Sequence, residues 1–133
     1  YITETGEEMV MASRSDGMGI SALKSAGLKL LILSKERNPV VAKRAEKLQI
    51  EVIQACDNKL EALTEWLLNN QLPLSQCAYV GNDINDLQCM QAVRLAIAPI
   101  DAHPLAAQAA HWRLTRAGGK GAIRELSDAI INC

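Results

Sequence analysis

From residue 17 onward, short apolar runs alternate with longer stretches of helical periodicity, and this alternation constrains the fold more than any other feature of the sequence. Such alternation indicates βαβ units around a parallel sheet, so we predict an α/β fold. The predicted strands are Leu28–Leu33, Glu51–Gln54, Cys77–Val80, Arg94–Ala98 and His111–Thr115. The predicted helices are Gly17–Ala26, Pro39–Leu48, Lys59–Asn69, Asp86–Ala92, Pro104–Ala110 and Gly121–Ile131.

The first residues follow a different pattern. Thr5 and Gly6 lie between Tyr1–Thr3 and Glu8–Ser13, which predicts an N-terminal β-hairpin ahead of the first helix. The sequence also begins without methionine, inside a strand-forming stretch. We interpret that beginning as a start within a longer protein.

Composition excludes several classes of protein. With 133 residues, 49% of them hydrophobic, we expect one domain. Lys and Arg number 14 against 15 Asp and Glu, and no basic run occurs, so a nucleic-acid partner is not expected. No apolar stretch is long enough to cross a membrane. The four cysteines lack zinc-site spacing, and scattered thiols in an α/β chain favour a cytoplasmic location.

Polar residues follow several of the predicted strands, where ligands bind in open parallel sheets. The loop Gly81–Asp86 follows Cys77–Val80 and carries two carboxylates, Asp83 and Asp86, at the start of a helix. Mg²⁺ prefers such hard oxygen ligands. Taken alone, the loop is more typical of Asx turns and a helix cap than of a metal site.

Ser34 and Lys59 follow two other strands. Ser34 comes directly after Leu28–Leu33, where a hydroxyl at the mouth of a helix can receive a phosphate or simply cap that helix. Lys59 begins a helix, a position that the helix dipole disfavours for a cation, so an anionic partner is one explanation. A solvated surface lysine is the alternative.

In this order, the serine, the lysine and the acidic loop Gly81–Asp86 resemble the later motifs of the haloacid dehalogenase superfamily. The resemblance implies a Rossmann-like, three-layer α/β/α fold without a cap domain. It also implies that Ser34 binds the transferring phosphoryl group and that Lys59 neutralises this group and orients the nucleophile. Asp83 would hold Mg²⁺, with Asp86 in support.

A closer resemblance covers nearly the whole chain. The segments at 14–20, 38–42, 101–104 and 118–125 are similar to the capless deoxy-octulosonate-phosphate phosphatases, and more so to the related domain of acylneuraminate cytidylyltransferases. That resemblance implies a homotetramer in which the hairpin and the Gly118–Gly121 segment complete a neighbour's active site. Expected substrate contacts are then Arg14, Asp16, Lys35 and Lys120.

One departure from the family concerns its nucleophile. Family members begin with an apolar strand that ends in Asp-x-Asp, whose first Asp attacks phosphorus, and this chain contains no such motif. We expect that strand to lie upstream and its position in the middle of the sheet to be empty here.

These motifs predict a Mg²⁺-dependent phosphatase acting on a sugar-acid phosphate through an aspartyl-phosphate. The principal alternative is a non-catalytic tetramerisation domain of an acylneuraminate cytidylyltransferase. A two-component receiver domain would share the sheet topology, but it needs an acidic pair near the start of the chain.

Overall fold

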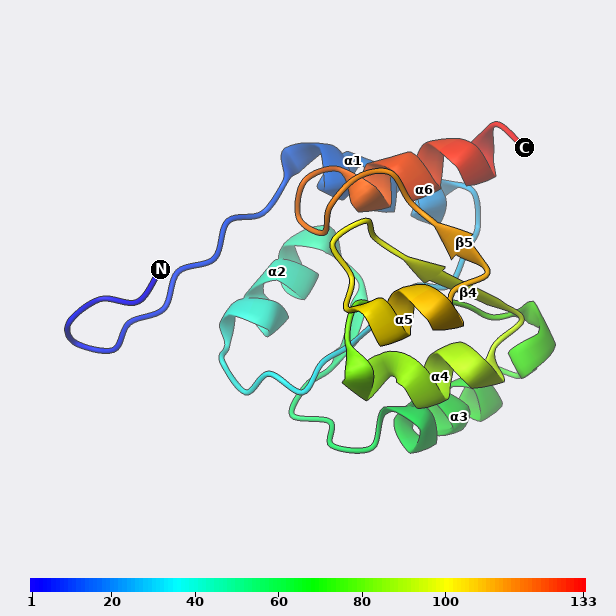
Figure 1. Ribbon diagram of the computed structural model, residues 1–133, viewed down its shortest axis with the longest axis horizontal. Coiled ribbons are helices and arrows are strands. Elements are labelled where there is room, and N and C mark those ends of the chain that lie inside the picture. Colours follow the sequence, from blue (N-terminus) through cyan, green and yellow to red (C-terminus); the bar gives the residue numbers. More distant parts are fainter.

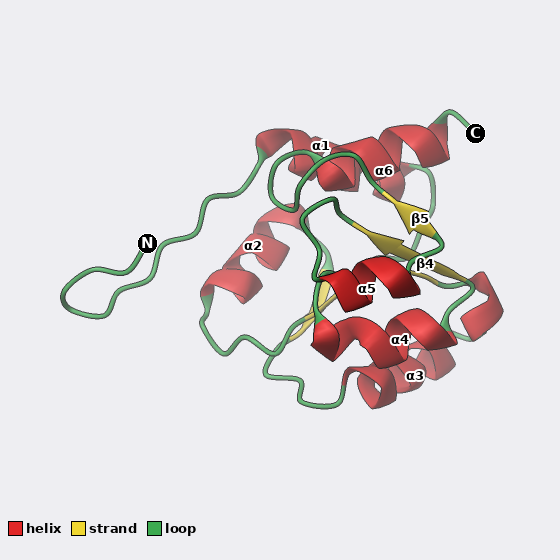
Figure 2. Cartoon of the chain, in the orientation of Figure 1, coloured by secondary structure: helices red, strands yellow, loops and turns green.

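The computed structural model describes residues 1–133 and places the strands between two layers of helices (Figures 1 and 2). The strands are β1 (Leu31–Leu33), β2 (Glu51–Ile53), β3 (Ala78–Val80), β4 (Leu95–Ala98) and β5 (Trp112–Arg113). The helices are α1 (Arg14–Ser25), α2 (Val40–Leu48), α3 (Lys59–Asn69), α4 (Leu87–Ala92), α5 (Pro104–Ala109) and α6 (Ala122–Ile131). Two 3₁₀ turns, η1 (Leu74–Gln76) and η2 (Ile84–Asp86), precede β3 and α4.

All of these strands pair in parallel, which confirms the predicted α/β class. The strands do not form one continuous sheet, however. β1 pairs only with β2, and β3 pairs with β4, which in turn pairs with β5. One edge of β1 and one edge of β3 therefore have no neighbouring strand, and Val80 on β3 is 37% exposed.

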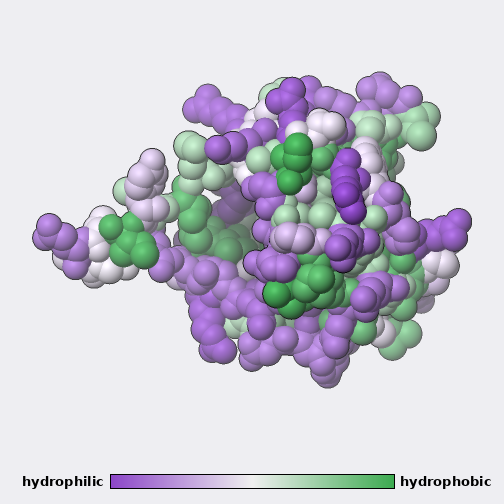
Figure 3. Space-filling view, in the orientation of Figure 1, coloured by the Kyte–Doolittle hydropathy of each residue, from purple (hydrophilic) through white to green (hydrophobic).

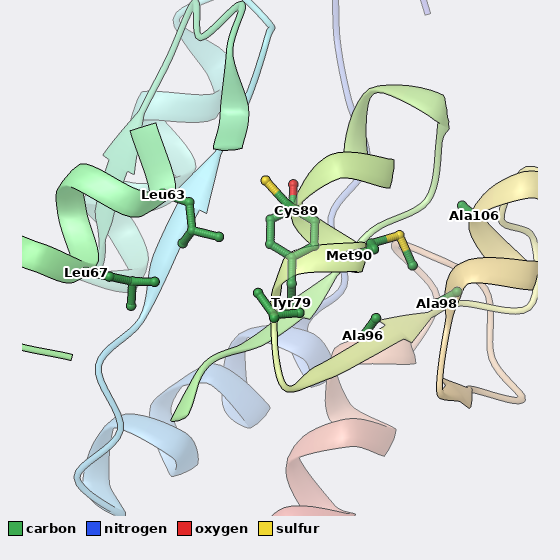
Figure 4. Close-up of a cluster of buried hydrophobic side chains, with 9 residues drawn as sticks. Leu63, Leu67, Tyr79, Cys89, Met90, Ala96, Ala98 and Ala106 are labelled. Carbon is green, nitrogen blue, oxygen red and sulfur yellow. The ribbon is translucent and has the colours of Figure 1, made fainter. Parts of the chain in front are cut away.

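Side chains of β4 alternate between two hydrophobic clusters, as expected for successive residues of a strand. Ala96 and Ala98 face the larger cluster, which the sheet forms with α3, α4 and α5 (Figure 4). Ile97 faces the smaller cluster, which it shares with Leu114 and α6. This alternation fixes the order of the three layers.

Helices α1 and α6 pack closely on one side of the sheet (Figure 1). Gly19 makes this approach possible, because a Cβ there would lie 2.7 Å from the Oγ of Ser127, which is fully buried. A side chain at position 19 would push the helices apart.

The predicted N-terminal hairpin forms only in part. Gly6 adopts a φ of 85°, and its N–H donates to the carbonyl of Thr3, so the expected turn is present. Its two arms share only one isolated bridge, between Ile2 and Glu8, and the predicted strand Glu8–Ser13 does not form. An isolated two-stranded ribbon with no third strand or helix beneath it is marginally stable, which explains the difference.

Residues 1–12 form an arm that projects from the body (Figure 1). The consecutive apolar residues Met9, Val10 and Met11 are 58–78% exposed along it. Apolar surface is visible on the arm and in the hollow where it joins the body (Figure 3).

Predicted and observed boundaries differ mainly at the ends of the strands, which are shorter than predicted. The predicted helix Lys59–Asn69 has the observed bounds of α3, whereas predicted Asp86–Ala92 divides into η2 and α4. None of the helices combines the length and apolar character needed to cross a membrane. Cys89 is fully buried, and burial raises the pKa of its thiol to about 11, so it serves as a small apolar core residue.

Candidate functional site

The loop after β3 is shaped by Gly81. A Cβ at this position would lie 2.6 Å from the sulfur of Met90 and 2.7 Å from the Cβ of Asp86, so only glycine fits without displacing buried groups. The backbone can therefore turn tightly, which leaves Asn82 and Asp83 exposed while Asp86 turns back into the protein.

Asp86 is the hydrogen-bonding centre of this loop. Its Oδ1 accepts from the Nζ of Lys59 at 2.9 Å and from the hydroxyl of Tyr79 at 2.5 Å. Its Oδ2 accepts from the backbone N–H groups of Asn82 at 2.9 Å and Asp83 at 3.2 Å. The side chains of Lys59 and Asp86 are only 10% and 4% exposed.

These contacts correct one sequence prediction. Each oxygen of Asp86 already accepts two hydrogen bonds, so this carboxylate has little capacity left to ligate a metal. Asp86 instead holds the Asp83 loop and Lys59 in place.

The environment of the cluster favours an ionised Asp86 and a protonated Tyr79. Burial alone would raise the pKa of Asp86, but the hydrogen bonds from Tyr79 and Lys59 outweigh it and lower that pKa below its ordinary value. Burial, followed by the adjacent carboxylate of Asp86, raises the pKa of Tyr79 well above its ordinary value. Tyr79 therefore remains a donor and Asp86 remains an anion.

Asp83 is the carboxylate best placed for a metal. It is exposed, and one of its oxygens accepts from the N–H of Ile84 at 2.7 Å. No three acidic, histidine or cysteine side chains gather closely enough to form a metal site by themselves. Mg²⁺ commonly binds through one or two carboxylates and completes its coordination with water and phosphate oxygens, so Asp83 fits that ion.

Ser34 directly follows the carboxyl end of β1. Backbone hydrogen bonds join it to the segment between β2 and Lys59. Its N–H donates to the carbonyl of Ile53 at 3.0 Å, and its carbonyl accepts from the N–H of Cys56 at 2.9 Å. Its Oγ accepts from the N–H of Glu36, which leaves the hydroxyl proton free to be donated. Asn38 accepts from the N–H of Val40 at the start of α2, so Ser34 is not needed as that cap.

The remaining predicted substrate contacts are Lys35, Arg14, Asp16 and Lys120, and of these only Lys35 lies beside Ser34. Lys35 is exposed beside Ser34, whereas Arg14 and Lys120 are exposed near the first turns of α1 and α6. Asp16 is buried, and its carboxylate accepts from the N–H groups of Gly121 at 3.2 Å and Arg124 at 2.9 Å.

The predicted substrate contact of Asp16 does not fit this geometry, because both carboxylate oxygens already accept backbone hydrogen bonds at the start of α6. Asp16 thereby joins α1 to α6. No hydrogen bond or ion pair connects Arg14, Asp16 or Lys120 to Ser34, Lys59 or Asp83 within the chain.

Tyr79 was not identified from the sequence. The signal was available, because a tyrosine in an apolar strand usually finds a hydrogen-bond partner for its hydroxyl when it is buried. The sequence did not show that this partner is Asp86, seven residues further along the chain.

A family model described as haloacid dehalogenase-like hydrolase matches residues 21–125. Among curated proteins, the 3-deoxy-D-manno-octulosonate 8-phosphate phosphatase of Yersinia pestis is 36% identical over 132 residues, which cover 98% of this chain and 71% of that protein. The N-acylneuraminate cytidylyltransferase A of Danio rerio is 30% identical over 135 residues, which cover 98% of this chain but only 31% of that protein.

The fold is also similar to that of a solved structure that contains bound ligands. The 3-deoxy-D-manno-octulosonate 8-phosphate phosphatase of Moraxella catarrhalis, crystallised with a magnesium ion, a phosphate ion and KDO, matches with a TM-score of 0.95 and 31% identity. The match covers 99% of this chain and 76% of that one. This likeness extends over all of the strands and helices described above.

Proposed function

Because this chain belongs to the haloacid dehalogenase-like hydrolases and is a phosphoric monoester hydrolase of that family, we propose that it acts as a Mg²⁺-dependent phosphatase on a sugar-acid phosphate in the cytoplasm. The observation that carries this proposal is the buried pair of Lys59 and Asp86 beneath the loop that presents Asp83. The named sugar-acid phosphatases among its relatives support the substrate class.

Each residue of the site has its own proposed contact with the phosphoryl group or the metal ion. Ser34 has a free hydroxyl proton for one phosphoryl oxygen, and Lys59 brings a positive charge to the same edge of the sheet. Lys35 is a further candidate for contact with the substrate. A Mg²⁺ ion held by Asp83 would neutralise negative charge on the phosphoryl oxygens.

The nucleophile is proposed to be an aspartate upstream of residue 1, on a strand that fits between β1 and β3. Its carboxylate would attack phosphorus and release the sugar hydroxyl, and water would then hydrolyse the resulting acyl phosphate. The unpaired edges of β1 and β3 support this placement, as does the exposure of Ala78 and Val80. Such a strand would bring its carboxyl end beside Ser34 and Asp83.

The alternative of a non-catalytic tetramerisation domain is not favoured. The serine, lysine and aspartates of the site are all retained, and the hydrogen bonds around Asp86 hold the loop in an ordered arrangement. The sequence also matches a larger share of the curated phosphatase than of the cytidylyltransferase.

The proposal is tested by replacing Asp83 with asparagine in the full-length protein. A neutral amide is a poorer ligand for a hard cation, so the Mg²⁺ concentration that gives half-maximal activity should rise at least ~10-fold. The measurement is phosphate release from a sugar-acid phosphate across a Mg²⁺ titration. Glu46→Gln removes one exposed charge from α2 and should leave the titration unchanged. Wild-type Mg²⁺ dependence in Asp83→Asn would contradict the metal assignment.

We also propose that the protein is a homotetramer in which the arm around Thr5 and Gly6 and the segment Gly118–Gly121 lie near a neighbour's Asp83. The exposed run Met9–Met11 supports this, because an apolar segment on an isolated arm needs a covering surface. Arg14 and Lys120 would then reach substrate across the subunit boundary.

The oligomer is tested by light scattering on the full-length protein. Replacing Met9 and Met11 with glutamate is expected to shift the mass from a tetramer toward a monomer, because the charges oppose burial of the arm. Met18→Glu introduces the same charge at an exposed position on α1 and should leave the mass unchanged. A wild-type protein that is monomeric and fully active would refute the shared site.

A further inference from the structure

Gln54 joins the loop of residues 34–38, here called the Ser34 loop, to the segment that leads to Lys59 (Figure 1). It directly follows β2 and is half-buried. Its side-chain Nε2 donates to the carbonyl of Glu36 at 3.1 Å and to that of Asn38 at 2.6 Å. Both partners are carbonyl oxygens, which only accept, so the nitrogen of the amide and not its oxygen must face them. Both N–H bonds of this amide are therefore directed at the Ser34 loop.

The contact with Glu36 bears directly on the hydroxyl of Ser34. The N–H of Glu36 donates to the Oγ of Ser34 at 3.0 Å. The carbonyl of Glu36 accepts from Gln54 and also from the N–H of Ala55 at 3.2 Å. Because the N–H and the carbonyl of Glu36 are both held, the peptide groups on either side of this residue have little freedom to rotate. The Oγ of Ser34 consequently keeps a fixed donor, and its own proton stays available for a phosphoryl oxygen.

The backbone of Ala55 shows that this segment is tightly constrained. Its φ is 52°, in the left-handed region that residues with a Cβ rarely adopt. Its N–H donates to the Ser34 loop, and the next N–H, that of Cys56, donates to the carbonyl of Ser34 at 2.9 Å. An unfavourable backbone conformation persists only where the surrounding contacts hold it. The hydrogen bonds to the Ser34 loop supply those contacts.

The other side-chain contact between these two segments is exposed. Arg37 and Asp57 form an ion pair at 3.9 Å, and both side chains are mostly exposed. Water and salt screen an ion pair in such a position, so it adds little to the order of the loop. The half-buried amide of Gln54 is therefore the side chain that fixes the Ser34 loop relative to the start of α3.

We propose that Gln54 is a positioning residue for phosphoryl transfer, which holds the Ser34 loop so that the hydroxyl of Ser34 meets the phosphoryl group beside Lys59. This inference rests on the proposed phosphatase function. Gln54 itself does not donate to the substrate, because both N–H bonds of its amide are occupied. Its effect on turnover passes through Glu36 to Ser34, so the effect should largely disappear when the serine hydroxyl is removed.

The test is a double-mutant cycle between Gln54→Met and Ser34→Ala in the full-length protein. Methionine has a side chain of similar length but no donor, so the Ser34 loop loses both hydrogen bonds. We expect Gln54→Met to lower kcat/KM for a sugar-acid phosphate about 10-fold, but less than about 2-fold when residue 34 is already alanine. The Mg²⁺ concentration that gives half-maximal activity should stay at the wild-type value, because the Asp83 loop is not changed. Gln76→Met makes the same substitution at an exposed position before β3 and should leave kcat/KM unchanged.

Amide hydrogen exchange provides a second measurement, which does not depend on activity. The N–H groups of Ala55 and Cys56 donate to the Ser34 loop, so their exchange in Gln54→Met should be at least ~10-fold faster than in the wild type. The N–H of Leu114 donates to the carbonyl of Ala98 within the sheet and should keep its wild-type rate. This amide serves as the internal control for global stability.

Equal losses of kcat/KM with and without the Ser34 hydroxyl would overturn the proposal. A wild-type kcat/KM or wild-type exchange rates in Gln54→Met would overturn it as well. A wild-type protein that releases no phosphate would instead contradict the proposed function, and the exchange rates would then decide by themselves whether Gln54 holds the Ser34 loop. If Gln54→Met does not fold, Gln54→Asn provides the cycle, because it keeps the amide but is one methylene too short to reach both carbonyls.

Discussion

Replacing Asp86 with alanine is expected to lower the free energy of unfolding by about 3–5 kcal/mol, the usual cost of removing one partner from a buried ion pair. The side chain of Lys59 is only 10% exposed, and the substitution would leave its ammonium group without a counter-charge. It would also remove the acceptor for the hydroxyl of Tyr79 and for the N–H groups of Asn82 and Asp83. Urea unfolding of the full-length protein, followed by circular dichroism, measures the effect.

The matched control is Asp128→Ala. Asp128 also forms an ion pair, with Arg124, but the side chain of Arg124 is 38% exposed and that of Asp128 is 56% exposed. Loss of this pair should therefore lower the free energy of unfolding by at most about 0.5 kcal/mol. Replacing both Lys59 with methionine and Asp86 with leucine should cost less than Asp86→Ala, because no unpaired charge is left buried. A loss below about 1 kcal/mol for Asp86→Ala would show that water reaches the site and satisfies the groups left behind.

The α/β class could be predicted from sequence because it depends on local pattern, whereas the three-layer order was implied by the family resemblance. The strand β4 shows why: Ala96, Ile97 and Ala98 are all apolar and all fully buried, as a strand covered by helices on both faces requires. The division into two sheets agrees with the expectation of an empty position in the middle of the sheet, but that expectation came from the family resemblance and not from this alternation. Alternation alone gives the elements but not every contact between them.

Lys59 illustrates a partial success. A cation at the start of α3 is unfavourable for the helix dipole, and that local conflict correctly indicated an anionic partner. The sequence prediction assigned this role to a phosphoryl group, whereas the structure also supplies Asp86, 27 residues away. The position of a long-range partner is set by how the strands align, which is not readable from the helix itself.

Asp16 illustrates the opposite case. Its place in the first turn of α1 is typical of an ordinary acidic residue near a helix start, and the family resemblance suggested a contact with substrate. Its partners are the N–H groups of Gly121 and Arg124, more than a hundred residues further on. Only the packing of α1 against α6 reveals that it is structural.

Replacing Lys59 with methionine in the full-length protein is expected to lower kcat about 100- to 1,000-fold, the loss typical of removing one electrostatic contact to a transition state. Methionine keeps much of the side chain's length but loses the charge that would stabilise the phosphoryl oxygens. The KM for a sugar-acid phosphate should change much less, because charge on those oxygens develops mainly in the transition state. Steady-state kinetics at saturating Mg²⁺ separate the two constants.

The structure requires a control for stability, because the same side chain neutralises Asp86. Lys59→Met leaves that carboxylate with three hydrogen bonds but no cation, so some loss of unfolding free energy is expected alongside the loss of activity. Lys43→Met removes an exposed charge on α2 and should change neither property. If Lys59→Met is less stable yet retains wild-type kcat below its unfolding temperature, the lysine serves only to hold Asp86. If kcat falls while the protein remains folded, its charge acts on the phosphoryl group.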